Sequence, residues 1–321
     1  MARQNSGAFW GGAGLVWRRQ RIVWWIFVVN FVLAFFSIHG VVPRTGAILD
    51  HSLAAHRLVN GFDLGALGEL MVQPGISPLD VSPAAMAYSL VFFVFMLFMT
   101  GGFLEVYSRD IRLTTSEYFE ACGAFFWRFF RLMIFLLLCL IPIAIFHHIL
   151  RAIANHIGDN AVSAMTGVWC SIVVGIVILV LLLILRLWFD MAEIYCVAQN
   201  ERRVRSALRM AWRVTFGNFR SLFRLFVGIG IIACIGFGFG LWLWMYVLPP
   251  TAIKTAFLLG QLIILWWLGT RLWQRSAETI WYQRYLARAA EVTAPALARY
   301  PVVTPQPPPS PMPPPGATDA V

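Results

Sequence analysis

The sequence predicts an all-α integral membrane protein with six transmembrane helices, arranged as three hairpins, with amphipathic elbow helices and both termini in the cytoplasm. Three observations support this fold class. Of 321 residues, 60% are hydrophobic and 12% are charged, and the mean hydropathy is +0.73, which is too apolar for a soluble domain. Six apolar segments approach the length of about 20 residues that a helix needs to cross a bilayer. Arginines gather in alternate connections between these segments.

Each predicted span is a segment with few or no charges inside it. The last one is short, and it is bounded by Lys254 and Arg271, whose long side chains can extend to the two membrane interfaces. The predicted spans cover, in chain order, about residues 22–42, 84–104, 132–150, 165–187, 225–248 and 255–273.

The distribution of arginine and lysine predicts the orientation. Most of the 25 basic residues lie before the first span, in the second and fourth connections, and after the last span, while Arg44, Arg57, Arg151 and Lys254 lie on the other side. The positive-inside rule therefore places both termini in the cytoplasm. The net charge of +10 follows from the same rule, so no nucleic-acid partner is expected.

Composition divides the chain into three parts. Residues 1–21 are rich in glycine and aromatic side chains and are predicted to lie at the cytoplasmic interface. Residues 22–286 form the membrane domain. Residues 287–321 include PVVTPQPPPSPMPPPG, which cannot form a core and is predicted to be a disordered cytoplasmic tail. Docking of this tail to a proline-binding module is the alternative.

Two connections carry the pattern of amphipathic helices. From Glu117 to Arg131, polar residues recur every three or four positions and aromatic side chains occupy the opposite face. From Val204 to Thr215, small and apolar residues line one face, while arginines line another at i, i+4 spacing. Both segments are predicted to lie flat on the membrane surface as elbows before the next span.

Short internal matches indicate a repeated unit. The sequence R-L-W, followed four residues later by A-E, occurs at residues 186–193 and again at residues 271–278. The sequence W-R-x-x-R occurs at residues 17–21 and 127–131. Self-similarity of this kind predicts three copies of an elbow, a span, an outer loop and a second span. Chance similarity of arginine and aromatic residues at membrane interfaces is the alternative.

Charged residues at the ends of spans are the candidate functional residues. They are spaced one or two helical turns apart, so that they share a face of their helix. Buried between helices, they could gate a pathway or hold a phosphate, whereas at the interface they would anchor the helix ends. These candidates are Arg186, Asp190, Glu193, Arg271 and Glu278.

The histidines are the candidate metal ligands, because all of them fall on the outer side of the predicted topology. Together with nearby aspartates, His51, His56, His147 and His148 could bind a metal or haem. The spacing H-E-x-x-H and comparable ligand motifs do not occur. We therefore interpret them as interfacial histidines and expect no bound metal or cofactor.

No catalytic motif was found. The sequence lacks a nucleophile elbow, a phosphate-binding loop and paired catalytic carboxylates, so we do not expect an enzyme. The fifth predicted span contains one G-x-x-x-G segment, from Gly236 to Gly240. It predicts close helix packing, with a broken, site-forming helix as the alternative.

The segment RLWFDMAEIYCVAQNE, followed by VRSALRMAWRVTFGNF at residues 204–219, resembles bacterial six-span integral membrane proteins. These are distantly similar to the membrane domain found in some glycerophosphodiester phosphodiesterases. The resemblance covers about residues 17–286 and implies the fold and a location in the bacterial inner membrane. It implies no phosphodiesterase activity, because no hydrolase sequence accompanies it.

Three functions remain open at this point. The first is a non-enzymatic scaffold, lipid-contacting protein or accessory component of an envelope assembly, motivated by the elbows and the proline-rich tail. The second is a transporter or permease, motivated by the repeats and the glycine-rich fifth span. The third is a metal- or haem-binding protein. Expected partners are membrane lipids, other proteins in the membrane and further copies of the chain.

Overall fold

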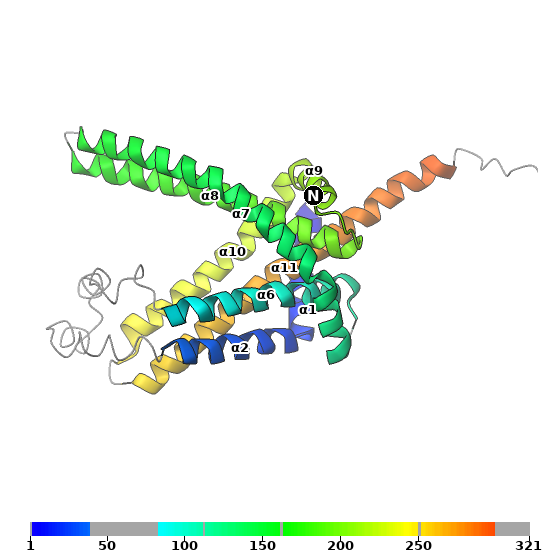
Figure 1. Cartoon of the computed structure of the whole chain (residues 1–321), viewed down its shortest axis with the longest axis horizontal. Helices are drawn as coiled ribbons and strands as arrows, with labels where there is room; N and C mark the ends of the chain where they lie inside the picture. The colour runs from blue at the N-terminus through cyan, green and yellow to red at the C-terminus, as the bar shows by residue number, and fades with distance from the viewer. Residues whose placement is uncertain (1, 39–82, 112, 161–162, 250–251, 299–321) are drawn as a thin grey trace, which may run out of the picture. The chain divides into compact units, whose positions relative to one another are not determined.

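A computed structural model describes residues 2–38, 83–111, 113–160, 163–249 and 252–298. Within these residues all regular structure is helical (Figure 1). Among the described residues, five helices are long and apolar enough to cross a membrane, or six if the bent pair near the amino terminus counts as one span. The chain divides into two units, residues 1–282 and 283–321, and the packing described below belongs to the first.

The helices differ from the predicted spans mainly in length. Their bounds are α1 Ala2–Arg18, α2 Arg21–Ile38, α6 Pro83–Arg109, α7 Thr115–Asp159, α8 Ala164–Ala198, α9 Val204–Gly217, α10 Phe219–Trp242, the π-helical turn η1 Leu243–Val247, and α11 Ile253–Ala298. Helix α7 is continuous through both a predicted elbow and a predicted span. Helix α11 includes residues 287–298, which the sequence assigned to the tail. Residues 299–321 and the outer loop with His51 and His56 lie outside the described residues.

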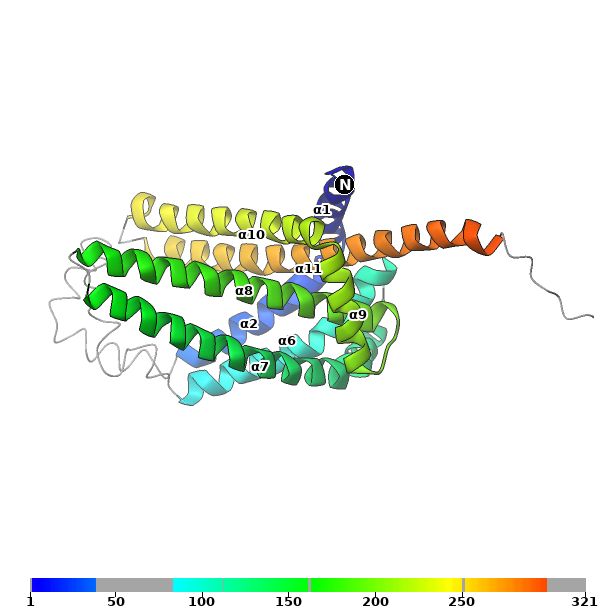
Figure 2. The same ribbon diagram turned by 90° about the horizontal axis from the view of Figure 1, so that it is seen from above.

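The long helices pack as pairs. Helix α2 packs on α6, and α7 packs on α8, and α10 lies beside α11 (Figures 1 and 2). The α10–α11 contact uses the G-x-x-x-G segment. A Cβ atom at Gly236 would collide with the Trp266 ring, and one at Gly240 would lie 2.6 Å from Ile263. Because α10 is continuous at both glycines, the close-packing interpretation is confirmed and the broken-helix alternative is wrong.

The predicted amphipathic elbows are helical. In α9 the side chains of Val204, Ala207 and Ala211 are buried, and the helix packs on α8. Arg205 and Arg209 are exposed on the opposite face, as their spacing predicts. The first turn of α7 is closed by a capping box, in which Thr114 and Glu117 each bind the other's backbone N–H. Helix α1 meets α2 at an angle of 69°.

Two helix ends are closed in the same way. Asp110 after α6 and Asn200 after α8 both have positive φ, at 49°, a conformation that Asp and Asn tolerate better than most residues. Each then binds an arginine from the elbow of its own helix pair. Arg19 donates to the Asp110 backbone oxygen at 2.8 Å, and Arg128 donates to the Asn200 side chain at 2.7 Å.

Two tryptophans of the R-L-W motifs also have equivalent contacts. Trp188 of α8 donates its indole N–H to the carbonyl of Leu208 in α9, at 3.0 Å. Trp273 of α11 donates to the carbonyl of Phe9 in α1, at 2.7 Å. The repeated sequence thus corresponds to a repeated contact, in which a long helix holds an elbow helix by a tryptophan.

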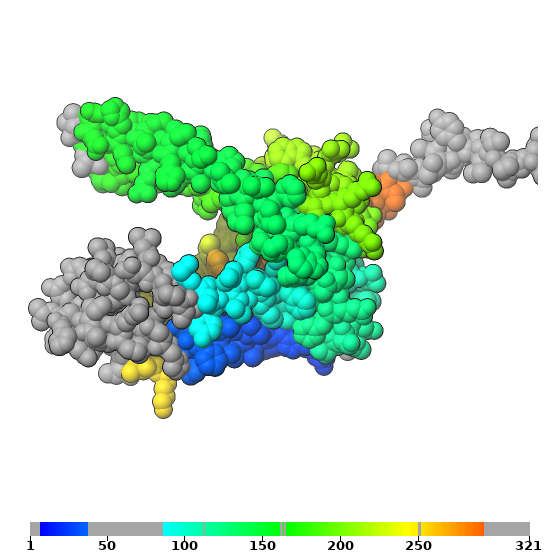
Figure 3. All heavy atoms as spheres, in the orientation of Figure 1, coloured from blue at the N-terminus to red at the C-terminus, as the bar shows by residue number. Residues whose placement is uncertain are grey.

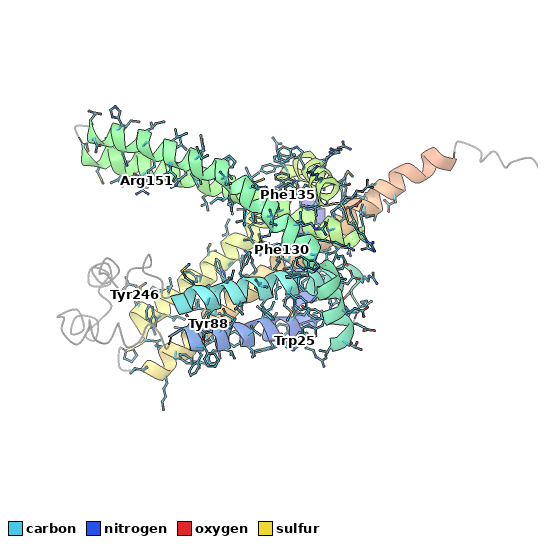
Figure 4. The ribbon with its side chains drawn as sticks, in the orientation of Figure 1. Trp25, Tyr88, Phe130, Phe135, Arg151 and Tyr246 are labelled. Atoms are coloured by element: carbon cyan, nitrogen blue, oxygen red, sulfur yellow. The ribbon has the colours of Figure 1, made fainter. Side chains whose placement is uncertain are left out.

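Aromatic side chains fill the contacts between elbows and long helices, while the α7–α8 pair is largely uncovered. Figure 4 shows Trp25 on α2 beside the first turns of α7, where its ring lies 5.3 Å from that of Tyr118. Farther along α7, side chains such as Leu137 and Ile141 are more than half exposed, and Arg151 projects from the same arm (Figure 4). Apolar exposure of this kind is expected of helices that face lipid.

Candidate functional site: a cavity with a charged end

A cavity of about 1450 Å³ lies between the long helices. Its walls come from α2, α6, α7, α8, α10 and α11, and they are mostly apolar. Figure 3 shows the hollow between the α7–α8 pair and α6. Representative wall residues are Phe92, Leu97, Leu136, Leu182, Phe237 and Ile263.

One end of the cavity is charged. Arg186, Asp190 and Glu193 reach it from α8, and Arg271 and Arg275 reach it from α11. The spacing is i, i+4, i+7 on α8 and i, i+4 on α11, which places the residues of each helix on one face. The charged face of α8 therefore meets the charged face of α11.

Arg275 is the centre of the charged cluster. Its guanidinium lies 2.8 Å from a carboxylate oxygen of Asp190 and 2.9 Å from one of Glu193. All three side chains are largely buried, with exposed fractions of 10%, 5% and 16%. Several of these atoms lack a well-aligned hydrogen bond, so the attraction is mainly that of opposite charges at short distance.

The two matched sequence segments meet face to face in this cluster. When residues 186–193 are aligned with residues 271–278, Asp190 corresponds to Arg275, and these two residues form the 2.8 Å ion pair. Equivalent positions of the repeat thus carry opposite charges where the helices touch. The pair joins α8 to α11 across the bundle.

Arg186 and Arg271 have weaker partners than Arg275. Arg186 lies 3.6 Å from the second oxygen of Asp190, its side chain is 29% exposed, and one of its buried nitrogens has no hydrogen-bond partner among the described residues. Arg271 is half-buried, and the described part of the chain gives it no ion pair. The positive charges of these two arginines also act on each other.

Glu278 lies behind the cavity lining. Its side chain is fully buried, and neither carboxylate oxygen has a hydrogen-bond partner within the residues that the structure describes. It interacts electrostatically with the same cluster, since Asp190 and Arg275 are its main charged neighbours. A buried carboxyl group without partners is costly in a membrane.

The structure brings all of the predicted charged candidates together between α8 and α11. Asp190 and Glu278 are buried there, while Arg186, Glu193 and Arg271 are partly buried, so the cluster lies between helices instead of only anchoring helix ends. Sequence reasoning missed Arg275 as a member of this group. Its signal was present, because residue 275 follows Arg271 by one turn and precedes Glu278 by three residues.

The histidine candidates are not brought together as a metal site in the described residues. His147 and His148 are neighbours on α7, with ring centroids 5.8 Å apart. Across the described ranges, no group of three His, Cys, Asp or Glu side chains is placed to hold a metal ion. His51 and His56 lie outside those ranges, so their part of the prediction stays open.

Comparison with known proteins adds no constraint: no family model, no curated protein and no solved structure matches the chain. The cavity and its charged end are therefore the features that point to a function.

Proposed function

We propose that this chain is a non-enzymatic six-span protein of the bacterial inner membrane that holds a lipid molecule inside its helix bundle. The observation behind the proposal is the cavity, which has apolar walls along its length and buried charges at one end. Acyl chains suit the apolar walls, and a polar headgroup suits the charged end. At about 1450 Å³, the cavity also exceeds the roughly 300–1,000 Å³ typical of sites for small soluble ligands.

The proposed topology has three hairpins, with α1 and α2 serving as elbow and first span. Its support is the bias of arginines toward one side and the repeated elbow contacts of Arg19 and Arg128. The resemblance to bacterial six-span proteins, and distantly to the membrane domain of some glycerophosphodiester phosphodiesterases, agrees with this topology. Protein partners and assembly with further copies of the chain belong to the same proposal.

The orientation gives a direct prediction. A green fluorescent protein fused after Val321 is expected to fluoresce in whole bacteria, because it folds in the cytoplasm. Alkaline phosphatase at the same position is expected to be inactive, since it requires export. Active phosphatase with no fluorescence would place the carboxyl terminus outside and contradict the six-span topology.

Filling the cavity is expected to expel the bound lipid. Leu136 lines the cavity, so Leu136→Trp places a large ring where an acyl chain would lie. We expect co-purified phospholipid, measured by mass spectrometry of the protein in mild detergent, to fall roughly tenfold, which corresponds to a loss of about 1.4 kcal/mol in binding.

Leu137→Trp is the matched control for this experiment. Leu137 is the next residue along α7 and is 54% exposed on the outer surface, so the same substitution there leaves the cavity open. We expect it to retain lipid like the unchanged protein. Equal lipid content in both variants would show that the co-purified lipid lies outside the cavity.

The cavity also supports a second candidate, a transporter that moves its ligand across the membrane. A cavity at the interfaces between helix pairs is what such a mechanism needs. The two functions differ in one measurement. A transporter would accelerate the movement of a labelled lipid or solute across liposome membranes, whereas a lipid-holding protein would bind without accelerating movement.

A further inference from the structure

We propose that Arg186 and Arg271 bind the phosphate group of an anionic phospholipid, whose acyl chains lie along the apolar walls of the cavity. This inference rests on the proposed function, since it names the ligand class of the same cavity.

The arginines at the charged end differ in how closely carboxylates approach them. Arg275 forms ion pairs with one oxygen of Asp190, at 2.8 Å, and with one oxygen of Glu193, at 2.9 Å. Arg186 then has only the remaining Asp190 oxygen, at 3.6 Å, and the described residues provide no ion pair for Arg271. Arg186 and Arg271 thus face the cavity with no carboxylate as close as those that pair with Arg275.

Leaving these two guanidinium groups without a close anion is costly. A cation within a membrane is expensive unless an anion or a set of hydrogen bonds compensates it. Glu278 offers no such bond, because its oxygens are buried without hydrogen-bond partners in the described part of the chain. An anion that enters the cavity would supply a close partner with hydrogen-bond acceptors.

The geometry of the two arginines suits a phosphate group. A guanidinium group presents its N–H donors as a planar fork, which matches the oxygens of a phosphate in a bidentate manner. Arg186 and Arg271 come from two facing helices and both line the cavity. A phosphate placed between them can accept hydrogen bonds from both sides.

The apolar walls of the cavity favour a lipid headgroup over a soluble phosphate. The arginines stand at the end of long apolar walls, which include Leu97, Leu136 and Phe237. A free phosphate would leave these walls uncovered, whereas acyl chains attached to the phosphate would cover them.

The arginine-rich connection after α8 lies next to this end, on the side that the positive-inside rule assigns to the cytoplasm. The lipid therefore belongs to the inner leaflet.

The test uses the full chain in mild detergent and three lipids with identical dioleoyl chains. These are phosphatidylglycerol, which is anionic, phosphatidylcholine, which is zwitterionic, and diacylglycerol, which has no phosphate. Native mass spectrometry counts the lipid that stays bound. We expect the unchanged protein to retain phosphatidylglycerol at least about tenfold better than diacylglycerol, with phosphatidylcholine between them.

Substitution of either arginine separates headgroup binding from acyl binding. Arg186→Gln and Arg271→Gln are each expected to lower phosphatidylglycerol retention about tenfold and to leave diacylglycerol retention unchanged. Arg271→Lys keeps the charge but removes the fork, so we expect an intermediate value. The matched control is Arg205→Gln, an exposed arginine on α9, which should bind all three lipids like the unchanged protein. Retained diacylglycerol binding also shows that the variants are folded.

The outcomes distinguish this inference from the proposed function. Equal retention of the three lipids, with no effect of either glutamine variant, would overturn the headgroup assignment and leave the lipid-holding function intact. Failure of the unchanged protein to retain any of them would overturn both. Binding of glycerol phosphate at the arginines, in place of the lipids, would also overturn the assignment, because the site would then serve a soluble phosphate.

Discussion

Replacing Arg275 with glutamine is expected to lower the free energy of unfolding by about 3–5 kcal/mol. The loss comes from two carboxylates, Asp190 and Glu193, which would be left buried without the cation that lies 2.8 and 2.9 Å from them. Removing one partner of a buried ion pair costs more than the pair contributes, because the other charges remain in a medium of low dielectric constant. Titration with a denaturing detergent, followed by tryptophan fluorescence, measures the change.

Two further variants complete this prediction. Arg288→Gln removes an exposed arginine from the same helix and is expected to change stability by no more than about 0.5 kcal/mol. A triple variant, Arg275→Met with Asp190→Leu and Glu193→Met, removes the charges together. It is expected to be more stable than Arg275→Gln alone, since apolar residues of similar volume can replace a buried ion pair. A cost below about 1 kcal/mol for Arg275→Gln would show that the pair is hydrated and not buried.

The sequence predicted the places where helices begin better than the places where they end. Helices α2 and α6 begin at Arg21 and Pro83, within a residue of the predicted spans. The elbow at residues 117–131 and the span that follows it form one helix instead of two. The change from an amphipathic to a uniformly apolar pattern marked a change of environment, and the backbone can continue through such a change because both patterns have the same helical period.

The candidate site was predicted in part for a similar reason. Spacing along one helix predicts which charges share a face, and this was enough to select Arg186, Asp190 and Glu193. Arg275 was missed because its role depends on the contact between α8 and α11. In that contact it faces Asp190, which occupies the equivalent position in the other matched segment. The cavity was outside the reach of sequence reasoning, because its existence depends on how α7 and α8 diverge from α6 (Figure 3).

The second prediction concerns Gly12, where α1 touches α11. Gly12→Val is expected to lower the free energy of unfolding by about 3–5 kcal/mol, as the sum of overpacking at about 1–3 kcal/mol and two lost hydrogen bonds at about 1 kcal/mol each. A Cβ atom at Gly12 would lie 2.8 Å from the backbone nitrogen of Ala277 and 2.9 Å from its Cα atom. Backbone atoms cannot rotate away as a side chain can, so α1 has to move.

The hydrogen bonds at risk are the ones that hold α1 on α11. Trp273 donates to the Phe9 carbonyl at 2.7 Å, and Ser276 donates to the Gly12 carbonyl at 2.9 Å. A displacement of α1 lengthens both bonds at once. It also leaves the buried hydroxyl of Ser276 with only its local acceptor, the carbonyl of Trp273.

Gly14→Val is the matched control, because a Cβ atom there meets nothing within 4 Å. Both substitutions make the same change in helix propensity on the same helix, so the difference between their unfolding free energies reports the contact with α11 alone. If Gly12→Val were as stable as Gly14→Val, the membrane surface and not α11 would hold α1 in place. A large difference between the two unfolding free energies would instead show that α11 holds α1 as part of the bundle. The same relation holds for α9, which α8 contacts through Trp188.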